Sequence, residues 1–409
     1  MELWPADARR ADPVERCTTV TRGLAPTPDR LDMLARMIEG FATPEGTRRF
    51  AERFPVLQHA QHFRAPKHVP GAGELLFSSI GLGTYLGEPD DASDQLYVQA
   101  VEAALRSGIN VLDTAINYRH QRSERNIGSA LHQLVENGTI QRDEVIVCSK
   151  AGYLSLDGAV PADPRAYFNR EYVATGVLKQ EEIAGRMHCM APKYLENQID
   201  RSRKNLGLET IDIYYLHNPE SQLGEVPREE FRARIKAAFH TLEKAVKAEK
   251  IRWYGIASWN AFRVPEDEQG FMSLELCEEA ARAAGGEHHH FRFVQLPFNL
   301  GMPEAMSLPT QHYGKENIPA LDFGREAELA MIGSASLYQG QLTHNLPDWL
   351  GEKIGMANDV ERALQFARSA PGILTALVGM GKPAHVFENI RVAKASPMTP
   401  DAFLALLAR

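Results

Sequence analysis

From residue 75 onward, short apolar runs alternate with longer stretches whose apolar residues recur at helical spacing. The short runs are rich in Val, Ile, Tyr and Phe, and several are apolar without alternation, as is typical of parallel strands buried on both faces. These runs predict strands at residues 76–82, 110–113, 144–149, 211–216, 253–257, 291–296, 330–334 and 374–379.

The stretches between these runs predict helices. In the first, residues 95–106, Val98, Val101 and Leu105 share one face and Gly108 follows as a helix stop. The others are residues 122–135, 193–206, 229–249, 272–284, 360–369 and 383–393. This alternation predicts an α/β protein built as a (β/α)8 TIM barrel, and an open doubly wound sheet is the alternative that the pattern leaves.

The first part of the chain has a different pattern, polar and rich in proline, in which residues 30–39 alone show helical spacing. We therefore divide the chain into a partly helical, accessory N-terminal extension at residues 1–62 and a barrel at residues 63–409. The extension is expected to pack on the barrel, with binding of a partner as the alternative. The loops after the third and sixth strands are enlarged.

Composition narrows the classes of function. The chain has 409 residues, about 160 more than a minimal barrel. Its 45 Lys and Arg against 53 Asp and Glu give a net charge of −8, which argues against nucleic-acid or anionic-membrane partners. Neither a membrane-spanning run nor an N-terminal secretion signal is apparent, and the four cysteines show no paired spacing. We expect a cytoplasmic protein without a bound metal.

Four titratable residues fall at or just after the ends of the second, third and fourth predicted strands: Asp113, Tyr118, Lys150 and His217. Each has an ordinary structural interpretation when taken singly, as a turn cap, a packed aromatic, a surface charge or a core histidine. Functional groups of a barrel belong at the C-terminal ends of its strands, so together the four predict one site.

The four residue types suit proton transfer to an oxygen. A tyrosine phenol, with a pKa of about 10, is a poor acid, and a lysine ammonium beside it lowers that pKa. A carboxylate keeps the lysine charged, and a histidine orients a substrate carbonyl. Together these roles supply the proton for the reduction of a carbonyl to an alcohol. The reduction also needs a hydride, which no side chain supplies, so a nicotinamide cofactor is implied. The alternative to a reduction is a lyase reaction in which Lys150 forms a Schiff base with a carbonyl substrate.

Several segments resemble signatures of the aldo-keto reductase family. They are DTAINYRHQRSERNIGSAL at 113–131, VIVCSKAGY at 145–153, LGLETIDIYYLHNPE at 206–220, KIRWYGIASWN at 250–260 and LVGMGKPAHVFENI at 377–390. The resemblance implies a barrel that binds NADP(H) across its C-terminal mouth, with Tyr118 as the general acid of a tetrad completed by Asp113, Lys150 and His217. It also implies nicotinamide contacts from Ser258, Asn260 and Gln295, and adenine contacts from Glu388 and Asn389.

The sequence departs from the family pattern at two places. Ser334 stands where the family presents a tyrosine that stacks on nicotinamide, so either Tyr338 stacks instead or the stacking is lost. The usual phosphate-clamping lysine and arginine are also missing, with Lys382 as the nearby cation. A single lysine clamps a phosphate less well than a lysine–arginine pair. We therefore expect NADP(H) to be favoured over NAD(H), although less strongly than the family implies.

The sequence thus predicts an NAD(P)H-dependent oxidoreductase that reversibly converts an aldehyde, ketone or sugar-like carbonyl to an alcohol (EC 1.1.1.-). A cofactor-sensing regulatory subunit, resembling the channel-associated members of the family, and a Schiff-base lyase are the alternatives. Tyr167, Phe168, Tyr172 and residues 188–190, in the loop after the third strand, are expected to line the substrate pocket. His188 and Cys189 lack further ligands at a metal-binding spacing.

Overall fold

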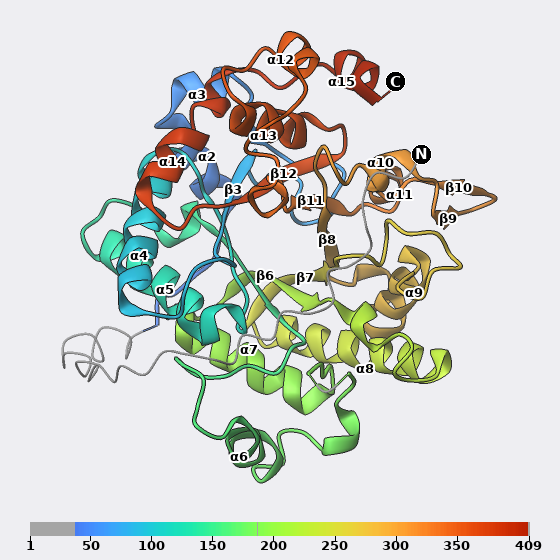
Figure 1. The fold of residues 1–409 in the computed structure, drawn as a ribbon. Helices are drawn as coiled ribbons and strands as arrows, with labels where there is room; N and C mark the ends of the chain where they lie inside the picture. The colour runs from blue at the N-terminus through green and yellow to red at the C-terminus, as the bar shows by residue number, and fades with distance from the viewer. Residues whose placement is uncertain (1–36, 186, 408–409) are drawn as a thin grey trace.

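The computed structural model describes residues 37–185 and 187–407, in which eight parallel strands close a barrel in the order β11-β12-β3-β4-β5-β6-β7-β8 (Figure 1). The predicted (β/α)8 class is confirmed, and each of the eight predicted strands overlaps a strand of the barrel. The strands are β3 (Ile80–Gly83), β4 (Val111–Asp113), β5 (Ile146–Ala151), β6 (Ile211–His217), β7 (Ile251–Ala257), β8 (Phe291–Pro297), β11 (Ala330–Ser334) and β12 (Ile373–Gly379).

Helices that follow the strands surround the barrel, and each helix predicted after residue 75 overlaps an observed one. They are α4 (Asp91–Arg106), α5 (Arg122–Glu136), α7 (Pro192–Leu206), α8 (Arg228–Lys247), α9 (Leu274–Gly285), α11 (Ala320–Glu326), α13 (Asp359–Ser369) and α14 (Pro383–Asn389). The prediction missed α11 and made α14 four residues too long. Local chemistry sets the ends: Asp90 accepts the Ser93 amide at the start of α4, and Gly207, at φ +64°, ends α7.

The N-terminal end of the barrel is closed by a short hairpin of β1 (Phe63–Arg64) and β2 (Phe77–Ser78). Phe77 packs in a buried cluster with Val111, Ile213 and Phe293, which lie inside the barrel. The single strand expected at residues 76–82 is therefore two strands: β2 pairs with β1, and the chain enters the barrel only at β3. Because this end of the barrel is closed, a ligand can enter from the opposite, C-terminal end.

The described part of the N-terminal extension is attached to the same end of the barrel. It holds α2 (Pro44–Glu52) and α3 (Pro55–His59), and Arg49 forms an ion pair with Glu144 at 2.9 Å. Of the helix expected at residues 30–39, residues 30–36 lie outside the described residues. The remainder is not helical, because Ile38 forms a parallel bridge with Leu208.

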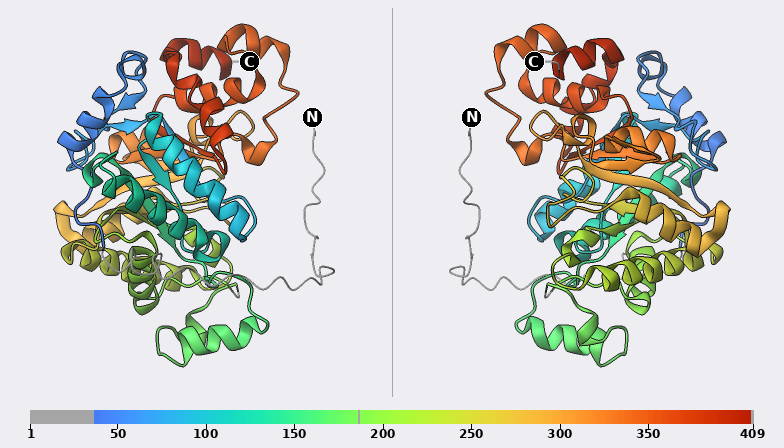
Figure 2. Two further views of the ribbon diagram at one scale, coloured as in Figure 1. Left: turned by 90° about the vertical axis from the view of Figure 1, so that its left-hand side faces the viewer. Right: turned by 90° about the vertical axis from the view of Figure 1, so that its right-hand side faces the viewer.

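Two enlarged loops and two further helices complete the molecule. The β5–α7 loop carries α6 (Pro164–Phe168) and protrudes at one end of the molecule, away from α12 (Asp348–Ile354) and α15 (Pro400–Leu407) (Figures 1 and 2). The loop after β8 holds α10 (Glu304–Ser307) and the hairpin β9 (Gln311–Tyr313) and β10 (Glu316–Ile318). Within residues 37–185 and 187–407, no helix is long and apolar enough to span a bilayer.

Candidate active site

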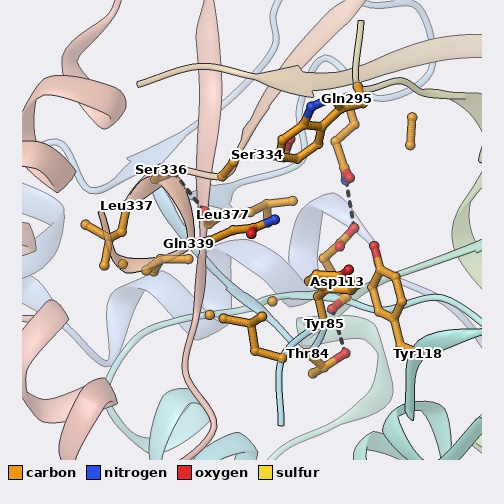
Figure 3. Close-up of a pocket in the computed structure, with 18 of the residues that line it drawn as sticks. Thr84, Tyr85, Asp113, Tyr118, Gln295, Ser334, Ser336, Leu337, Gln339 and Leu377 are labelled. Carbon is orange, nitrogen blue, oxygen red and sulfur yellow. Dashed lines mark hydrogen bonds between the residues drawn. The ribbon is translucent and has the colours of Figure 1, made fainter. Parts of the chain in front are cut away.

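A cavity of about 860 Å³ opens at the C-terminal mouth of the barrel (Figure 3). Its lining brings together most of the predicted site residues: Asp113, Tyr118, His217, Ser258, Gln295, Ser334, Glu388 and Asn389. Lys150 is completely buried behind this surface, Asn260 lines an adjoining cavity of about 420 Å³, and Lys382 lines neither. The volume is at the upper end of the range for ligand pockets, as an extended dinucleotide requires.

A buried ion pair forms the floor of the site. Lys150 Nζ lies 2.5 Å from Asp113 Oδ1 and donates a second hydrogen bond to the Thr114 carbonyl at 2.8 Å. The other carboxylate oxygen, Oδ2, accepts a hydrogen bond from Gln295 Nε2 at 2.8 Å, which ties β4 to β8 across the mouth (Figure 3). Burial lowers the pKa of Lys150, but Asp113 and the Tyr118 phenol outweigh burial, and the net shift is upward.

Tyr118 lies directly over this pair, with its ring centroid 4.8 Å from Lys150 Nζ. Burial raises the pKa of the phenol, whereas Lys150 lowers it, and burial is the larger effect. From the sequence alone, we expected only the lowering of the Tyr118 pKa by Lys150. The structure therefore gives a phenol that is protonated at neutral pH, with an ammonium beside it to stabilise the phenolate left after proton transfer.

His217 completes the group at the end of β6. Its ring meets the Tyr118 ring edge-on, with the centroids 5.7 Å apart. Burial, followed by the charge of Lys150 and by His188, holds the pKa of His217 well below 6.5, so the imidazole is neutral. Its Nδ1 is buried and has no hydrogen-bond partner among the described residues. A neutral imidazole can donate an N–H to a substrate oxygen without competing with Tyr118 as the acid.

The β5–α7 loop supports His217 from behind. His188 Nε2 lies 2.8 Å from the His217 carbonyl oxygen, and the Gln222 amide lies 2.9 Å from His188 Nδ1. Tyr153 packs edge-on against both histidine rings, at centroid distances of 5.2 Å. The position of His217 therefore depends on a loop far from it in sequence.

The loop residues that we expected in the substrate pocket occupy other positions. Tyr167, Tyr172 and Cys189 form a separate buried cluster, with Phe168 packed against it, and none of the four lines the cavity. From this loop, Tyr153 and Met187 line the cavity instead. No group of three metal-binding side chains occurs in residues 37–185 and 187–407.

Glu220 is a site residue that the sequence reasoning missed, although it ends one of the quoted motifs. Its Oε1 accepts hydrogen bonds from the Ser258 hydroxyl at 2.9 Å, the Trp259 amide at 2.7 Å and the Asn260 amide at 3.1 Å. Burial raises the pKa of Glu220, and these hydrogen bonds oppose the rise. The Glu220 carboxyl group thus fixes the turn after β7. Because the Ser258 hydroxyl donates its proton to Glu220, its oxygen is left to accept a hydrogen bond.

Tyr338 does not take the position of the missing stacking tyrosine. A Cβ placed on Gly301 would lie 3.2 Å from Tyr338 Cδ1, so the ring lies against the loop after β8 and is absent from the cavity lining. The backbone at Tyr338 and Gln339 is left-handed, at φ +47° and +53°, and Gln339 lines the cavity in its place (Figure 3).

Part of the chain matches a known protein family. Residues 79–267 match the model of the Aldo/keto reductase family. A putative voltage-gated potassium channel subunit beta from Schizosaccharomyces pombe is 22% identical over 383 residues, 83% of this chain and 92% of that protein. An NADH-specific methylglyoxal reductase from Escherichia coli is 29% identical over 162 residues, 37% of this chain and 41% of that enzyme.

A solved structure shares the fold at low sequence identity. The aldo/keto reductase from Klebsiella pneumoniae in complex with NADP and acetate has a TM-score of 0.53 and 19% identity, over 81% of this chain and 91% of that one. The match to the aldo/keto reductase family covers residues 79–267, a little under half of the chain. That segment contains β3 to β7 and the four tetrad residues.

Proposed function

We propose that this chain is an NAD(P)H-dependent oxidoreductase that reversibly reduces the carbonyl group of an aldehyde, ketone or sugar-like substrate to an alcohol. One observation carries the proposal: Asp113, Tyr118, Lys150 and His217 come together from three neighbouring strand ends, and three of the four line one large cavity. The family supports the same chemistry.

In this mechanism Tyr118 Oη donates its proton to the carbonyl oxygen while His217 holds that oxygen through an N–H donor. A reduced nicotinamide, when bound, supplies the hydride that adds to the carbonyl carbon, so the product is an alcohol. Tyr118 is left as a phenolate, and the ammonium of Lys150, 4.8 Å from the ring centroid, stabilises the new charge. Asp113 keeps that ammonium protonated and in place.

The residues around the tetrad suit a nicotinamide cofactor. Gln295 uses Nε2 to hold Asp113, and its carbonyl oxygen is a candidate acceptor for the carboxamide. The Ser258 hydroxyl oxygen is a candidate acceptor as well, because the hydroxyl proton is already donated to Glu220. We assign the adenosine part to the lining contributed by α14, which includes Glu388 and Asn389.

The proposal is tested by a pair of tyrosine variants. Tyr118→Phe removes the acid, and we expect carbonyl turnover to fall at least about 100-fold, the size of a typical general-acid contribution. Tyr85→Phe is the matched control, because Tyr85 also lines the cavity and packs edge-on against Tyr118 at 5.1 Å. Cofactor binding, followed by fluorescence titration, should persist in both variants. Equal turnover in Tyr118→Phe and wild type would disprove the role of Tyr118.

A regulatory subunit is the second candidate function, favoured by the long match to the Schizosaccharomyces pombe protein. Such a subunit would bind cofactor and a membrane-protein partner in fixed ratio without turning over any carbonyl in a panel. A Schiff base on Lys150 has no structural support. Its Nζ donates to Asp113 and Thr114, its pKa is raised, and it does not line the cavity.

A further inference from the structure

The backbone directly after Tyr118 is left-handed over three residues. Arg119, His120 and Gln121 have φ angles of +47°, +56° and +71°, and none of them is glycine. L-residues disfavour this region because Cβ crowds the following carbonyl oxygen, so a run of three is strained. Such strain persists only where the surrounding structure holds it. The turn that joins Tyr118 to α5 must therefore be held by its neighbours.

Arg119 makes the contacts on one side of this turn. Its side chain is 1% exposed. Nε and Nη2 donate to the Glu88 carbonyl oxygen at 2.9 and 2.8 Å, and Nη2 also donates to Asp94 Oδ1 at 2.7 Å. The guanidinium carbon lies 4.8 Å from the centroid of the Tyr97 ring. The guanidinium therefore joins the turn to α4, which carries Asp94 and Tyr97, and to the β3–α4 loop, which carries Glu88.

The β5–α7 loop and α7 hold the other side of the turn. The Gly158 amide donates to the His120 carbonyl oxygen at 2.8 Å. The Gln121 side chain donates to the Leu156 carbonyl oxygen at 2.8 Å and accepts a hydrogen bond from Asn205 Nδ2 at 3.1 Å. Each of the three left-handed residues thus has a contact of its own with the surrounding structure.

The contacts of Arg119 reach the edge of the active-site cavity without entering it. The β3–α4 loop that Arg119 binds also carries Leu86, which lines the cavity, and the Tyr97 hydroxyl donates to the Leu86 carbonyl oxygen. Residues 119–121 themselves do not line the cavity. Arg119 is therefore connected to the site through the backbone of Tyr118 and through this loop.

We propose that Arg119 is a positioning residue for the general acid. The inference rests on the proposed function, because it concerns how Tyr118 is held. By fixing the first residue of the left-handed turn, Arg119 keeps the Tyr118 ring centroid 4.8 Å from Lys150 Nζ. Without the guanidinium, the turn relaxes toward the backbone region that L-residues favour, and the phenol moves away from the ammonium. A displacement of about 1 Å in a reacting group can reduce turnover about 100-fold.

The test compares kcat in Arg119→Ala and Arg142→Ala, both in the full chain. Arg142 is a matched control, because its side chain is 5% exposed, pairs with Asp212 at 2.7 Å and donates to two backbone carbonyl oxygens. It precedes β5 and so lies at the opposite, N-terminal end of the barrel. We expect kcat to fall about tenfold or more in Arg119→Ala and to stay near the wild-type value in Arg142→Ala. Cofactor affinity should persist in both variants, because neither arginine lines the cavity.

Two further measurements distinguish positioning from a loss of stability. Arg119→Gly also removes the guanidinium but tolerates positive φ, so it should recover part of the kcat that Arg119→Ala loses. Hydrogen exchange followed by mass spectrometry should be faster across residues 116–121 in Arg119→Ala and unchanged there in Arg142→Ala. If Arg119→Ala does not fold, Arg119→Lys replaces it with the same expectations, because lysine keeps the charge but cannot reproduce the forked contacts of the guanidinium.

The outcomes separate this inference from the proposed function. A kcat in Arg119→Ala equal to that in Arg142→Ala would overturn the inference, and so would unchanged exchange at residues 116–121. Equal kcat in Arg119→Gly and Arg119→Ala would refute the part played by the left-handed backbone. If wild type oxidises reduced cofactor with no carbonyl, the proposed function fails, and the exchange result alone decides whether Arg119 holds the Tyr118 turn.

Discussion

Replacing Asp113 with asparagine removes one charge from the buried pair and leaves the Lys150 ammonium without a counter-ion. Lys150 is fully buried and Asp113 is 5% exposed, so water cannot take the place of the carboxylate. At the observed 2.5 Å, the gross attraction is about 6–7 kcal/mol at an effective dielectric constant of about 20. After the desolvation of the carboxylate is subtracted, we expect the variant to lose about 3–5 kcal/mol of stability.

The loss should depend on pH in a defined direction. In the wild type the pKa of Lys150 is raised above 10.5, so its stabilising contribution is present below that value and fades as pH rises through the folded-state pKa. In Asp113→Asn, burial acts without the carboxylate and lowers the pKa of Lys150. Folding then favours the neutral amine, and the variant gains stability as pH rises toward 10.5. The difference between the two proteins is therefore largest near pH 7 and narrows at higher pH.

Urea unfolding followed by circular dichroism at pH 7 and at about pH 9.5 measures this difference. Asp157→Asn is the control, because the Arg125–Asp157 pair has a similar 2.6 Å separation while both side chains are more than a third exposed. That variant should lose at most about 1 kcal/mol. A loss in Asp113→Asn no larger than in the control, or a difference that widens with pH, would refute our account of the buried pair.

Two further predictions concern the acid and its support. Because the pKa of His217 is lowered and that of Tyr118 is raised, kcat/KM for reduction should stay level from about pH 6 to 9, and an inflection near 6.5 would contradict a neutral His217. In Gly152→Ala, the new Cβ would lie 2.5 Å from the His217 carbonyl oxygen and 2.7 Å from His188 Nε2. We expect it to reduce kcat about tenfold or more while cofactor affinity persists. Gly176→Ala is the control: its Cβ would meet nothing within 4 Å, and the strain from its φ of +71° falls on an exposed part of the loop. A kcat equal to that of Gly176→Ala would refute the coupling.

The barrel was predictable from sequence because strands buried on both faces leave continuous apolar runs. The break near Ser79 was not, since the residues on either side of it, Phe77 and Ile80, are equally buried. Hydrophobicity alone does not show that β2 pairs with β1 at the barrel floor while β3 pairs within the barrel.

The tetrad was predictable because barrel topology brings neighbouring strand ends together. The direction of the Tyr118 pKa was not, because it depends on whether burial or Lys150 has the larger effect, and burial cannot be measured from sequence. The hydrogen bonds of Glu220 to the turn after β7 likewise depend on how two separate loops meet.

Side-chain direction in the loops was the other limit of prediction. Aromatic residues such as Tyr167 and Tyr172 suit a substrate pocket or a small core equally well, and the structure places them in a core. Tyr338 and the residue after it, Gln339, both have positive φ, and this backbone conformation, unusual for residues other than glycine, directs Gln339 to the cavity.

The central claim is that Tyr118 supplies the proton in a nicotinamide-dependent carbonyl reduction. A single-turnover experiment tests it most directly: the protein is loaded with reduced cofactor and mixed with a panel of aldehydes, ketones and sugars. The near-ultraviolet absorbance of the reduced nicotinamide reports oxidation of the cofactor. We predict that the absorbance decays in wild type and Tyr85→Phe with at least one carbonyl, and persists in cofactor-loaded Tyr118→Phe. Equal decay in Tyr118→Phe, or bound cofactor that no carbonyl oxidises in wild type, would contradict the account.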